Sequence, residues 1–272
     1  MTSPERRTDT RPVKRTAIIA GSGSLPVTLA NALVHPVYVT FSDIPVPEGA
    51  EHVAARVEKL GKLFKDLKAR DVVAVTFAGA MARPKINPVL MDRHAVKLAM
   101  SLGKGDDGLL REVIAVFESQ GFMIRSATEI CPDLVLEKGT LWGRKPTAQD
   151  EADAARAKAV LDALSPLDVG QGAVCAGGQM LGIETVQGTD AMLAYVAQTP
   201  DPLRRAPGVF VKGPKRGQDL RIDMPTIGPD TITAAQTAGI GGVVIPAGQV
   251  IVLDADAVKA RIAEAGMFLK AI

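Results

Sequence analysis

Two apolar runs that each end in a glycine-containing turn place the strongest constraint on the fold. Residues 16–20 (T-A-I-I-A) lead into G-S-G-S, and residues 72–77 (V-V-A-V-T-F) lead into A-G-A-M-A-R-P. The apolar residues of segments 26–33 and 60–69 have helical spacing, and residues 37–41 (V-Y-V-T-F) predict a further strand. Strands that alternate with helices and end in glycine predict a parallel α/β sheet.

The two turns are expected on one rim of that sheet, because ligands of such sheets bind beyond the carboxyl ends of the strands. We therefore expect a ligand to contact four residues on this rim: Gly23, Ser24, Gly79 and Ala80. Arg83 follows in the second turn, where it either contacts the same ligand or, ahead of Pro84, ends a structural element.

The first turn departs from the dinucleotide-binding fingerprint G-x-G-x-x-G. Its third glycine position is occupied by Pro26, so nicotinamide binding is not predicted. Backbone N–H groups at the start of a helix still attract phosphate. A tight strand-to-helix turn without a ligand explains the pattern equally well.

The second half of the chain begins after a basic turn, G-R-K-P, at residues 143–146. Thr147 and Asp150 form the T-x-x-D pattern of a capping box, which predicts a helix start. The dipeptide Gly177–Gly178 between two apolar runs predicts a β-hairpin, and a hairpin added to strand–helix units predicts a mixed sheet. We expect three parts: a loose tail at residues 1–14, a Rossmann-like domain at 15–142 and a second α/β domain at 143–272.

Segment 211–228, V-K-G-P-K-R-G-Q-D-L-R-I-D-M-P-T-I-G, mixes charged and turn-forming residues. Its glycines and prolines disfavour a helix or a central strand, so we predict a loop. Cations suit a phosphate, and a carboxylate suits the hard metal ion that accompanies one. The charged residues are Lys212, Lys215, Arg216, Asp219, Arg221 and Asp223. A solvated surface loop is the alternative.

The composition disfavours several classes of protein. A net charge of only +2 and an aromatic content of 4% are atypical of nucleic-acid binding. Two cysteines without a CxxC motif predict no disulfide framework and a reducing compartment. No apolar run reaches the length of a membrane span, and the N-terminal residues lack the apolar core of a signal peptide. We therefore expect a cytoplasmic protein.

Several familiar catalytic motifs are absent from the sequence. The three histidines, His35, His52 and His94, lack zinc-ligand spacing. Neither the nucleophile elbow G-x-S-x-G nor the phosphate-binding loop G-x-x-x-x-G-K-[ST] occurs. Carboxylates remain as general bases or metal ligands, which favours magnesium chemistry on a phosphate.

Two further motifs have both a structural and a functional interpretation. In G-K-G-D-D-G, Asp106 or Asp107 caps the following helix, or contacts a metal or a hydroxyl beside Lys104. In Q-G-T-D, Thr189 or Asp190 is a natural N-cap for the next helix.

Six motifs, in chain order, resemble a family of UDP-2,3-diacylglucosamine pyrophosphatases. They are I-I-A-G-S-G-S-L-P-V, F-A-G-A-M-A-R-P, G-K-G-D-D-G-L-L-R, L-D-V-G-Q-G-A-V, Q-G-T-D-A-M-L and K-G-P-K-R…R-I-D-M-P-T-I-G. This is the magnesium-dependent, two-domain type of lipid A synthesis in Gram-negative bacteria, unrelated to the calcineurin-like enzyme for the same step. The resemblance covers residues 15–272.

The resemblance implies a substrate in a cleft between two domains and attack of water on the α-phosphorus. The products are UMP and 2,3-diacylglucosamine 1-phosphate (lipid X). The essential aspartate of the motif R-[IV]-D-[LM]-P-T-I-G corresponds to Asp223. The family's E-G-T-D is Q-G-T-D here, so Gln187 departs while Thr189 and Asp190 are kept. Ser22 replaces a more usual glycine in the first turn.

The residue patterns and the resemblance together give an expected site. We expect catalytic roles for Asp223, Asp190 and Gln171, with Asp223 also binding Mg²⁺. Substrate contacts are expected from Gly23, Ser24, Gly79, Ala80, Arg83, Lys104, Asp107, Thr189, Lys212 and Lys215. The acyl chains require an apolar groove, and the cations of segment 211–228 face either the pyrophosphate or the membrane.

The expected setting is the inner membrane, which the protein visits peripherally; a homodimer is left open. The alternative function is a non-catalytic nucleotide-sugar or acyl-lipid binding protein of the same fold.

Overall fold

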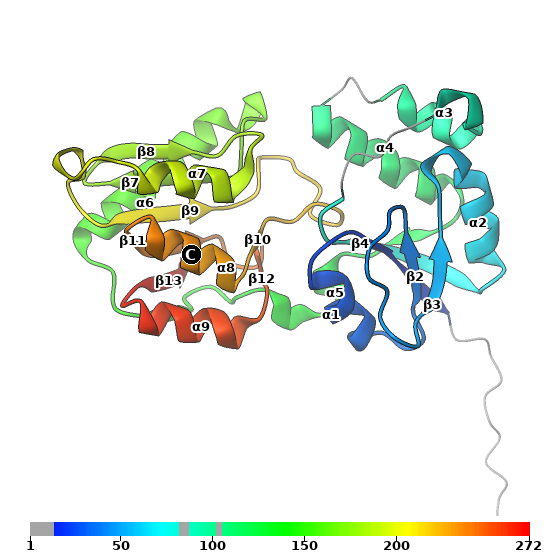
Figure 1. Cartoon of the computed structure of the whole chain (residues 1–272), viewed down its shortest axis with the longest axis horizontal. Helices are drawn as coiled ribbons and strands as arrows, with labels where there is room; N and C mark the ends of the chain where they lie inside the picture. Colours follow the sequence, from blue (N-terminus) through cyan, green and yellow to red (C-terminus); the bar gives the residue numbers. More distant parts are fainter. Residues whose placement is uncertain (1–13, 82–86, 102–104) are drawn as a thin grey trace, which may run out of the picture. The chain divides into compact units, whose positions relative to one another are not determined.

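The chain divides into two units, Met1–Ser126 and Ala127–Ile272. The computed structural model describes residues 14–81, 87–101 and 105–272, and of residues 105–107 the backbone alone. Each unit has its own main sheet (Figure 1). The boundary expected after residue 142 falls inside the strand β6 (Leu141–Gly143), which pairs with the sheet of the second unit. The boundary between the units therefore follows Ser126, earlier in the chain than the basic turn at residues 143–146 indicated.

The first unit is built on a five-stranded sheet with parallel pairing throughout. In spatial order its strands are β3 (Glu51–Ala54), β2 (Val37–Thr40), β1 (Arg15–Ala20), β4 (Val72–Ala78) and β5 (Met123–Ile124). The three strands predicted from apolar runs are thus confirmed. The sequence does not predict β3, because this edge strand, E-H-V-A, buries only Val53.

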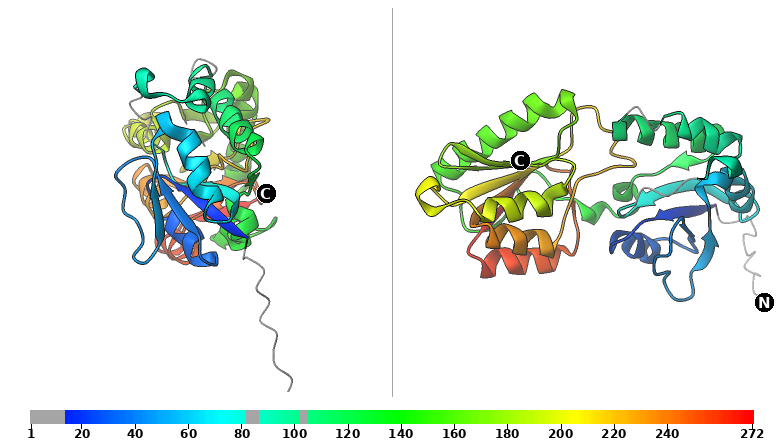
Figure 2. Two further views of the ribbon diagram at one scale, coloured as in Figure 1. Left: turned by 90° about the vertical axis from the view of Figure 1, so that its right-hand side faces the viewer. Right: turned by 45° about the horizontal axis from the view of Figure 1, so that its top comes forward.

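Helices cover both faces of this sheet (Figure 2). They are α1 (Leu25–Ala32), α2 (Leu60–Lys68), α3 (Arg93–Ala99) and α4 (Gly105–Ser119), with the 3₁₀ turns η1 (Val57–Lys59) and η2 (Pro88–Leu90). On α2 the buried residues Leu60, Leu63, Phe64 and Leu67 form the expected apolar stripe. On α1, Leu25 and Leu29 are buried, whereas Ala32 is exposed.

The second unit has a six-stranded mixed sheet, as the hairpin predicted. In spatial order its strands are β6, β13 (Phe268–Ala271), β11 (Ile240–Ile245), β9 (Gly208–Lys212), β7 (Gly172–Ala176) and β8 (Gln179–Ile183). β9, β11 and β13 are parallel, whereas β7 is antiparallel to both of its neighbours and β6 is antiparallel to β13. A separate pair joins β10 (Thr226–Ile227) to β12 (Ile251–Val252). The α/β fold class with a mixed second sheet is confirmed.

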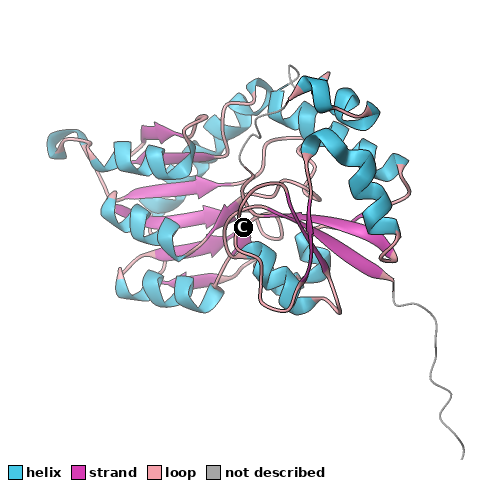
Figure 3. Cartoon of the chain, turned by 45° about the vertical axis from the view of Figure 1, so that its right-hand side comes forward, coloured by secondary structure: helices cyan, strands magenta, loops and turns pink. Residues whose placement is uncertain are grey.

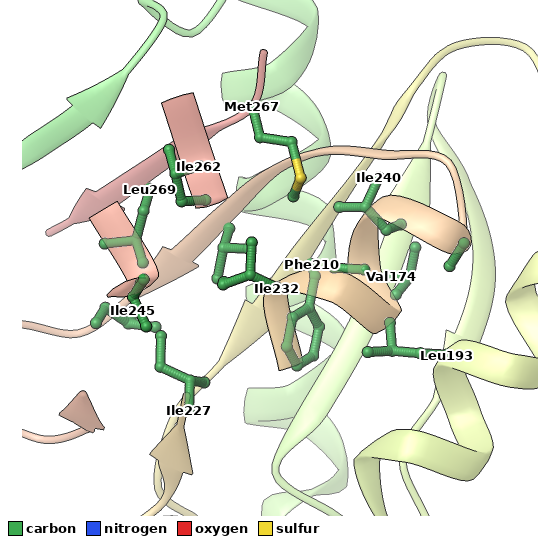
Figure 4. Packing of buried hydrophobic residues seen from close by; sticks show 14 of the residues in the cluster. Val174, Leu193, Phe210, Ile227, Ile232, Ile240, Ile245, Ile262, Met267 and Leu269 are labelled. Atoms are coloured by element: carbon green, nitrogen blue, oxygen red, sulfur yellow. The ribbon is translucent and has the colours of Figure 1, made fainter. Parts of the chain in front are cut away.

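Alternate residues of these strands enter two different cores, and helices lie on both sides of the strands (Figure 3). Val209 and Val211 pack with Ala157 of α6 (Ala148–Leu164) on one face. Phe210 points to the opposite face, with Leu193 among the residues of the larger cluster (Figure 4). The helices of that face are α7 (Gly188–Ala197), α8 (Pro229–Thr237) and α9 (Ala255–Glu264). Short elements complete the unit: α5 (Ala127–Ile130), η3 (Pro132–Leu134), η4 (Ser165–Leu167) and η5 (Asp201–Leu203).

The start of α6 confirms the predicted capping box. Thr147 Oγ1 accepts a hydrogen bond from Asp150 N (3.2 Å), and Asp150 Oδ2 accepts one from Thr147 N (2.7 Å). Burial would raise the pKa of Asp150, but hydrogen bonds from Arg144 and Thr147 outweigh it and hold the pKa below its ordinary value. Among the described residues, no helix has the length and apolarity that a membrane crossing requires.

The cap predicted for α7 is wrong. Gln187 occupies the N-cap of α7, and Thr189, whose hydroxyl donates to Glu184 instead, lies in the first turn with Asp190. Asp190 still occupies a position where a carboxylate interacts favourably with the helix dipole.

Candidate functional site

The two glycine turns of the first unit lie side by side, as predicted. Gly21 N donates to Ala78 O (2.7 Å), Ser22 N to Ala80 O (2.8 Å) and Ala80 N to Ser22 O (3.0 Å). The turns follow β1 and β4, which are neighbours in the sheet. The chain leaves β1 toward β2 on one side and reaches β4 on the other, so this is a topological switch point, where α/β sheets bind ligands.

Glycine is required in these turns by close approach of the backbones. A Cβ at Gly79 would lie 2.4 Å from Ser22 O, and a Cβ at Gly21 would lie 2.4 Å from Ala80 O. Gly79 also has a φ of +85°. Gly23, Ser24 and Ala80 are exposed on the rim. The rim therefore presents mainly backbone and small side chains.

Three further residues predicted to contact the substrate lie wholly or partly outside the described residues. Arg83 and Lys104 lie outside the described residues. Asp107 lies in the first turn of α4, and its side chain is outside the described part of the chain.

Antiparallel pairing gathers three chain segments at one edge of the second sheet. β9 ends at Lys212, and Gly172, the first residue of β7, pairs with it. β8 returns beside β7, and Glu184 N donates to Gly172 O (2.8 Å). Gly213 N donates to Gln171 O (2.9 Å). The residues before β7, after β8 and after β9 therefore converge.

A buried polar triad lies at this edge. Lys212 is 6% exposed and Glu184 is 9% exposed. Lys212 Nζ donates to Thr189 Oγ1 and lies 3.5 Å from Glu184 Oε2, and Thr189 Oγ1 donates to Glu184 Oε2 (2.9 Å). A Cβ at Gly172 would lie 2.5 Å from Glu184 Oε2, so this glycine makes room for the carboxylate. The predicted site residues Thr189 and Lys212 are thus brought together, and the charge of Lys212 is balanced inside the unit.

A second network holds Asp223. Gln171 Nε2 donates to Gln218 Oε1 (3.1 Å), which also accepts a hydrogen bond from Lys215 N (2.9 Å). Gln218 Nε2 donates to Asp223 Oδ2. Asp223 is half-buried. Gln171, Lys215 and Asp223, all predicted from the sequence, are therefore joined through one glutamine.

The remaining charged residues near this edge are less closely connected to Asp223. Lys215 Nζ contacts Asp168 Oδ1, and Arg221 pairs with Asp219 (2.7 Å). Asp190 follows Thr189 on α7 and is exposed. Asp190 is adjacent in sequence to Thr189 of the triad, but its side chain takes no part in the hydrogen bonds of the triad described above.

Two residues of the networks, Glu184 and Gln218, were not predicted. Glu184 follows directly after β8 and is a carboxylate at a strand end, which is a recognisable signal. Gln218 is an uncharged residue of a charged loop, and its importance follows only from its contacts with Gln171 and Asp223.

A cavity of about 610 Å³ lies beside the same loop in the second unit. Apolar side chains form much of its wall: Leu161, Val211, Pro214, Val244, Ile245 and Pro246. Four lysines also line it: Lys138, Lys158, Lys215 and Lys270. The cavity therefore combines an apolar wall with positive charge.

The donor set around Asp223 is suited to magnesium. Across the part of the chain that the structure describes, no three His, Cys, Asp or Glu side chains form a complete metal site. Mg²⁺ is commonly held by one or two carboxylates together with substrate phosphates and waters. The Asp223 carboxylate, oriented by Gln218, is an oxygen ligand of the required kind.

These features define a two-unit α/β protein with a backbone rim at the strand ends of one unit and a network of carboxylates and cations at the strand ends of the other. Two family models match the chain, the LpxI N-terminal domain over residues 15–134 and the LpxI C-terminal domain over residues 137–270. The UDP-2,3-diacylglucosamine pyrophosphatase LpxI of Caulobacter vibrioides is 37% identical over 272 residues, which cover 94% of this chain and 97% of that protein. The chain therefore belongs to the LpxI family, and the resemblance found in the sequence is confirmed.

Proposed function

We propose that this protein hydrolyses the pyrophosphate bond of UDP-2,3-diacylglucosamine, the activity named for its Caulobacter relative. Water attacks the α-phosphorus, and the bond to the bridging oxygen breaks to give UMP and 2,3-diacylglucosamine 1-phosphate, an intermediate of lipid A synthesis. The observation that carries the proposal is the convergence of Asp223 with Gln171 and Lys215 at one sheet edge.

The uridine diphosphate part is assigned to the rim of the first unit. Its backbone N–H groups suit phosphate oxygens, and small side chains allow a close approach. The rim residues assigned to this contact are Gly23, Ser24, Gly79 and Ala80. Arg83, Lys104 and Asp107 remain predictions for the same substrate.

The chemical step is assigned to the second unit. Asp223, held by Gln218, orients the attacking water. Asp223 would hold Mg²⁺, which would supply charge neutralisation at the phosphoryl oxygens. Lys215 adds positive charge from the same loop, and Glu184 keeps Lys212 and Thr189 in fixed positions. Asp190 is assigned to the same reaction from its place beside Thr189.

The acyl chains are assigned to the cavity of about 610 Å³. Ligand pockets have volumes of roughly 300–1,000 Å³. Each CH₂ group removed from water contributes about 0.8 kcal/mol, so an apolar wall such as Leu161, Val244 and Ile245 provides a strong driving force. Among the lysines of the cavity, Lys158, Lys215 and Lys270 are paired with carboxylates of the unit. A diacyl substrate also implies peripheral contact with the cytoplasmic face of the inner membrane.

Hydrolysis in H₂¹⁸O tests this function directly. With UDP-2,3-diacylglucosamine and Mg²⁺, we expect release of UMP that carries one ¹⁸O, unlabelled lipid 1-phosphate, and no turnover in excess EDTA. If ¹⁸O is found in the lipid phosphate instead, water attacks the β-phosphorus. Tight substrate binding without UMP release would instead establish a non-catalytic binding protein.

A further inference from the structure

Three of the four cations of segment 211–228 are paired within the second unit. Lys212 is buried against Glu184 and Thr189. Lys215 is 18% exposed at its side chain and pairs with Asp168. Arg221 pairs with Asp219. Charges that are balanced within the unit attract an external anionic surface only weakly, so these three residues contribute little to a membrane contact.

The first unit exposes a group of apolar side chains within η2 and α3 and next to them. Val89 is 90% exposed, Leu90 39%, Val96 45% and Met100 78%. Val96 and Met100 are four residues apart, so they lie on one side of the helical turn, and Val89 and Leu90 form the preceding 3₁₀ turn. We call these four residues the apolar patch. Side chains that insert between lipid headgroups have this character.

Basic side chains lie on α2, the helix that contacts α3. α2 contacts α3, as Figure 1 shows. Arg93 of α3 and three lysines of α2 line one hollow. The lysines are Lys62, Lys65 and Lys68. All three are exposed.

Three carboxylates among the described residues of this region are bonded to the protein itself. Asp92 accepts hydrogen bonds from the backbone N–H groups of Gly61 (2.6 Å), His94 (3.0 Å) and Ala95 (3.0 Å). Glu58 accepts one from Asn87 N (3.0 Å). Asp66 pairs with Lys62 (3.0 Å). Lys65, Lys68 and Arg93 are exposed, and Lys68 Nζ lies 5.8 Å from the centroid of the Phe122 ring.

We propose that η2, α3 and α2 form the surface that binds an anionic lipid bilayer, with the apolar patch inserted and the lysines of α2 against the headgroup phosphates. The proposal rests on the proposed function, because a diacyl substrate resides in a bilayer. A lysine close to an anionic leaflet strengthens binding by about fivefold. Insertion of exposed apolar side chains adds a contribution that salt does not screen.

Vesicle co-sedimentation of the full chain, without substrate, tests the proposal. We expect binding to vesicles of phosphatidylglycerol and phosphatidylcholine, and much weaker binding to phosphatidylcholine alone. Lys65→Glu with Lys68→Glu should weaken binding by at least about tenfold. Val89→Ser with Met100→Ser should weaken it at low and at high salt. The matched controls are Lys145→Glu with Lys259→Glu, and Tyr195→Ser with Leu203→Ser, all at exposed positions of the second unit.

The outcomes that would contradict membrane binding by this surface can be told apart. Equal losses in the control pairs, or wild-type binding by the patch variants, would overturn the proposal. Loss of a dimer in the patch variants during analytical ultracentrifugation would assign the surface to a second copy of the chain. Hydrolysis of substrate in detergent micelles separates this proposal from the proposed function: the patch variants should retain wild-type turnover there. Absence of hydrolysis by the wild type would contradict the function and leave vesicle binding as an independent result.

Discussion

The two units offer a ligand different kinds of surface. In the first, two turns approach so closely that Gly21 and Gly79 leave no room for a Cβ, and backbone forms the rim. In the second, Glu184, Lys212 and Asp223 are side chains already bonded within the protein. A backbone rim offers hydrogen-bond donors that carry no net charge. A side-chain network holds charged groups in place, and each of these groups depends on its partners. On the proposed assignment, nucleotide binding belongs to the first unit and the handling of charge belongs to the second.

The largest expected effect comes from breaking the buried triad of the second unit. Lys212→Met leaves the Glu184 carboxylate buried without its cation, and loss of one partner of a buried pair costs about 3–5 kcal/mol in the free energy of unfolding. Lys212→Met combined with Glu184→Met should recover most of that loss. Urea denaturation measures both.

An exposed pair in the same unit is the matched control for this effect. Lys158 and Asp162 lie 2.6 Å apart with half-exposed side chains. Lys158→Met should cost less than about 1 kcal/mol. If Lys212→Met lowers the free energy of unfolding as little as Lys158→Met does, the triad is not a coupled unit.

A smaller effect is expected from blocking the rim of the first unit. Ser24→Trp places a large side chain on the exposed rim and should raise KM for the substrate by about tenfold, or 1.4 kcal/mol, with little change in kcat. Asn31→Trp, at an exposed position of α1, the helix that follows Ser24, is the control. Gly79 is a poor choice for this test. Any side chain at this position would be strained at a φ of +85° and would clash with Ser22 O, so a substitution would disturb the fold. An unchanged KM for Ser24→Trp would remove the nucleotide from this rim.

The smallest effect concerns the cavity of the second unit. Leu161→Trp narrows it, and a mismatch of this kind in an apolar pocket costs about 1–3 kcal/mol. We expect KM for a long-chain substrate to rise by about fivefold, near the low end of that range, and KM for a short-chain analogue to stay unchanged. Equal effects on the two substrates would show that the acyl chains bind elsewhere.

The fold and the rim could be predicted because their signals are local. The run T-A-I-I-A followed by glycine identifies both β1 and its turn, and Thr147 with Asp150 identifies the start of α6. The strand β3 lacks such a signal, because only one of its residues is buried.

The site of the second unit was predicted only in part, for a different reason. Asp223 and Lys215 lie in a loop whose mixed charge is visible in the sequence. Their connection to Gln171 passes through Gln218, 47 positions along the chain from Gln171, and Glu184 meets Lys212 across 28 positions. Such contacts arise from antiparallel pairing of β7 with β8 and β9, which no short motif encodes.

The turnover of Asp223→Asn most directly tests the claim that chemistry belongs to the second unit and nucleotide binding to the first. We expect kcat to fall by about 10²–10³, as for loss of an interaction made in the transition state, while the Kd for substrate stays near the wild-type value. Asp230→Asn, at an exposed carboxylate of the same unit, should retain wild-type turnover. A kcat within a factor of two of the wild type in Asp223→Asn, or a loss of affinity as large as the loss of turnover, would contradict this division between the units.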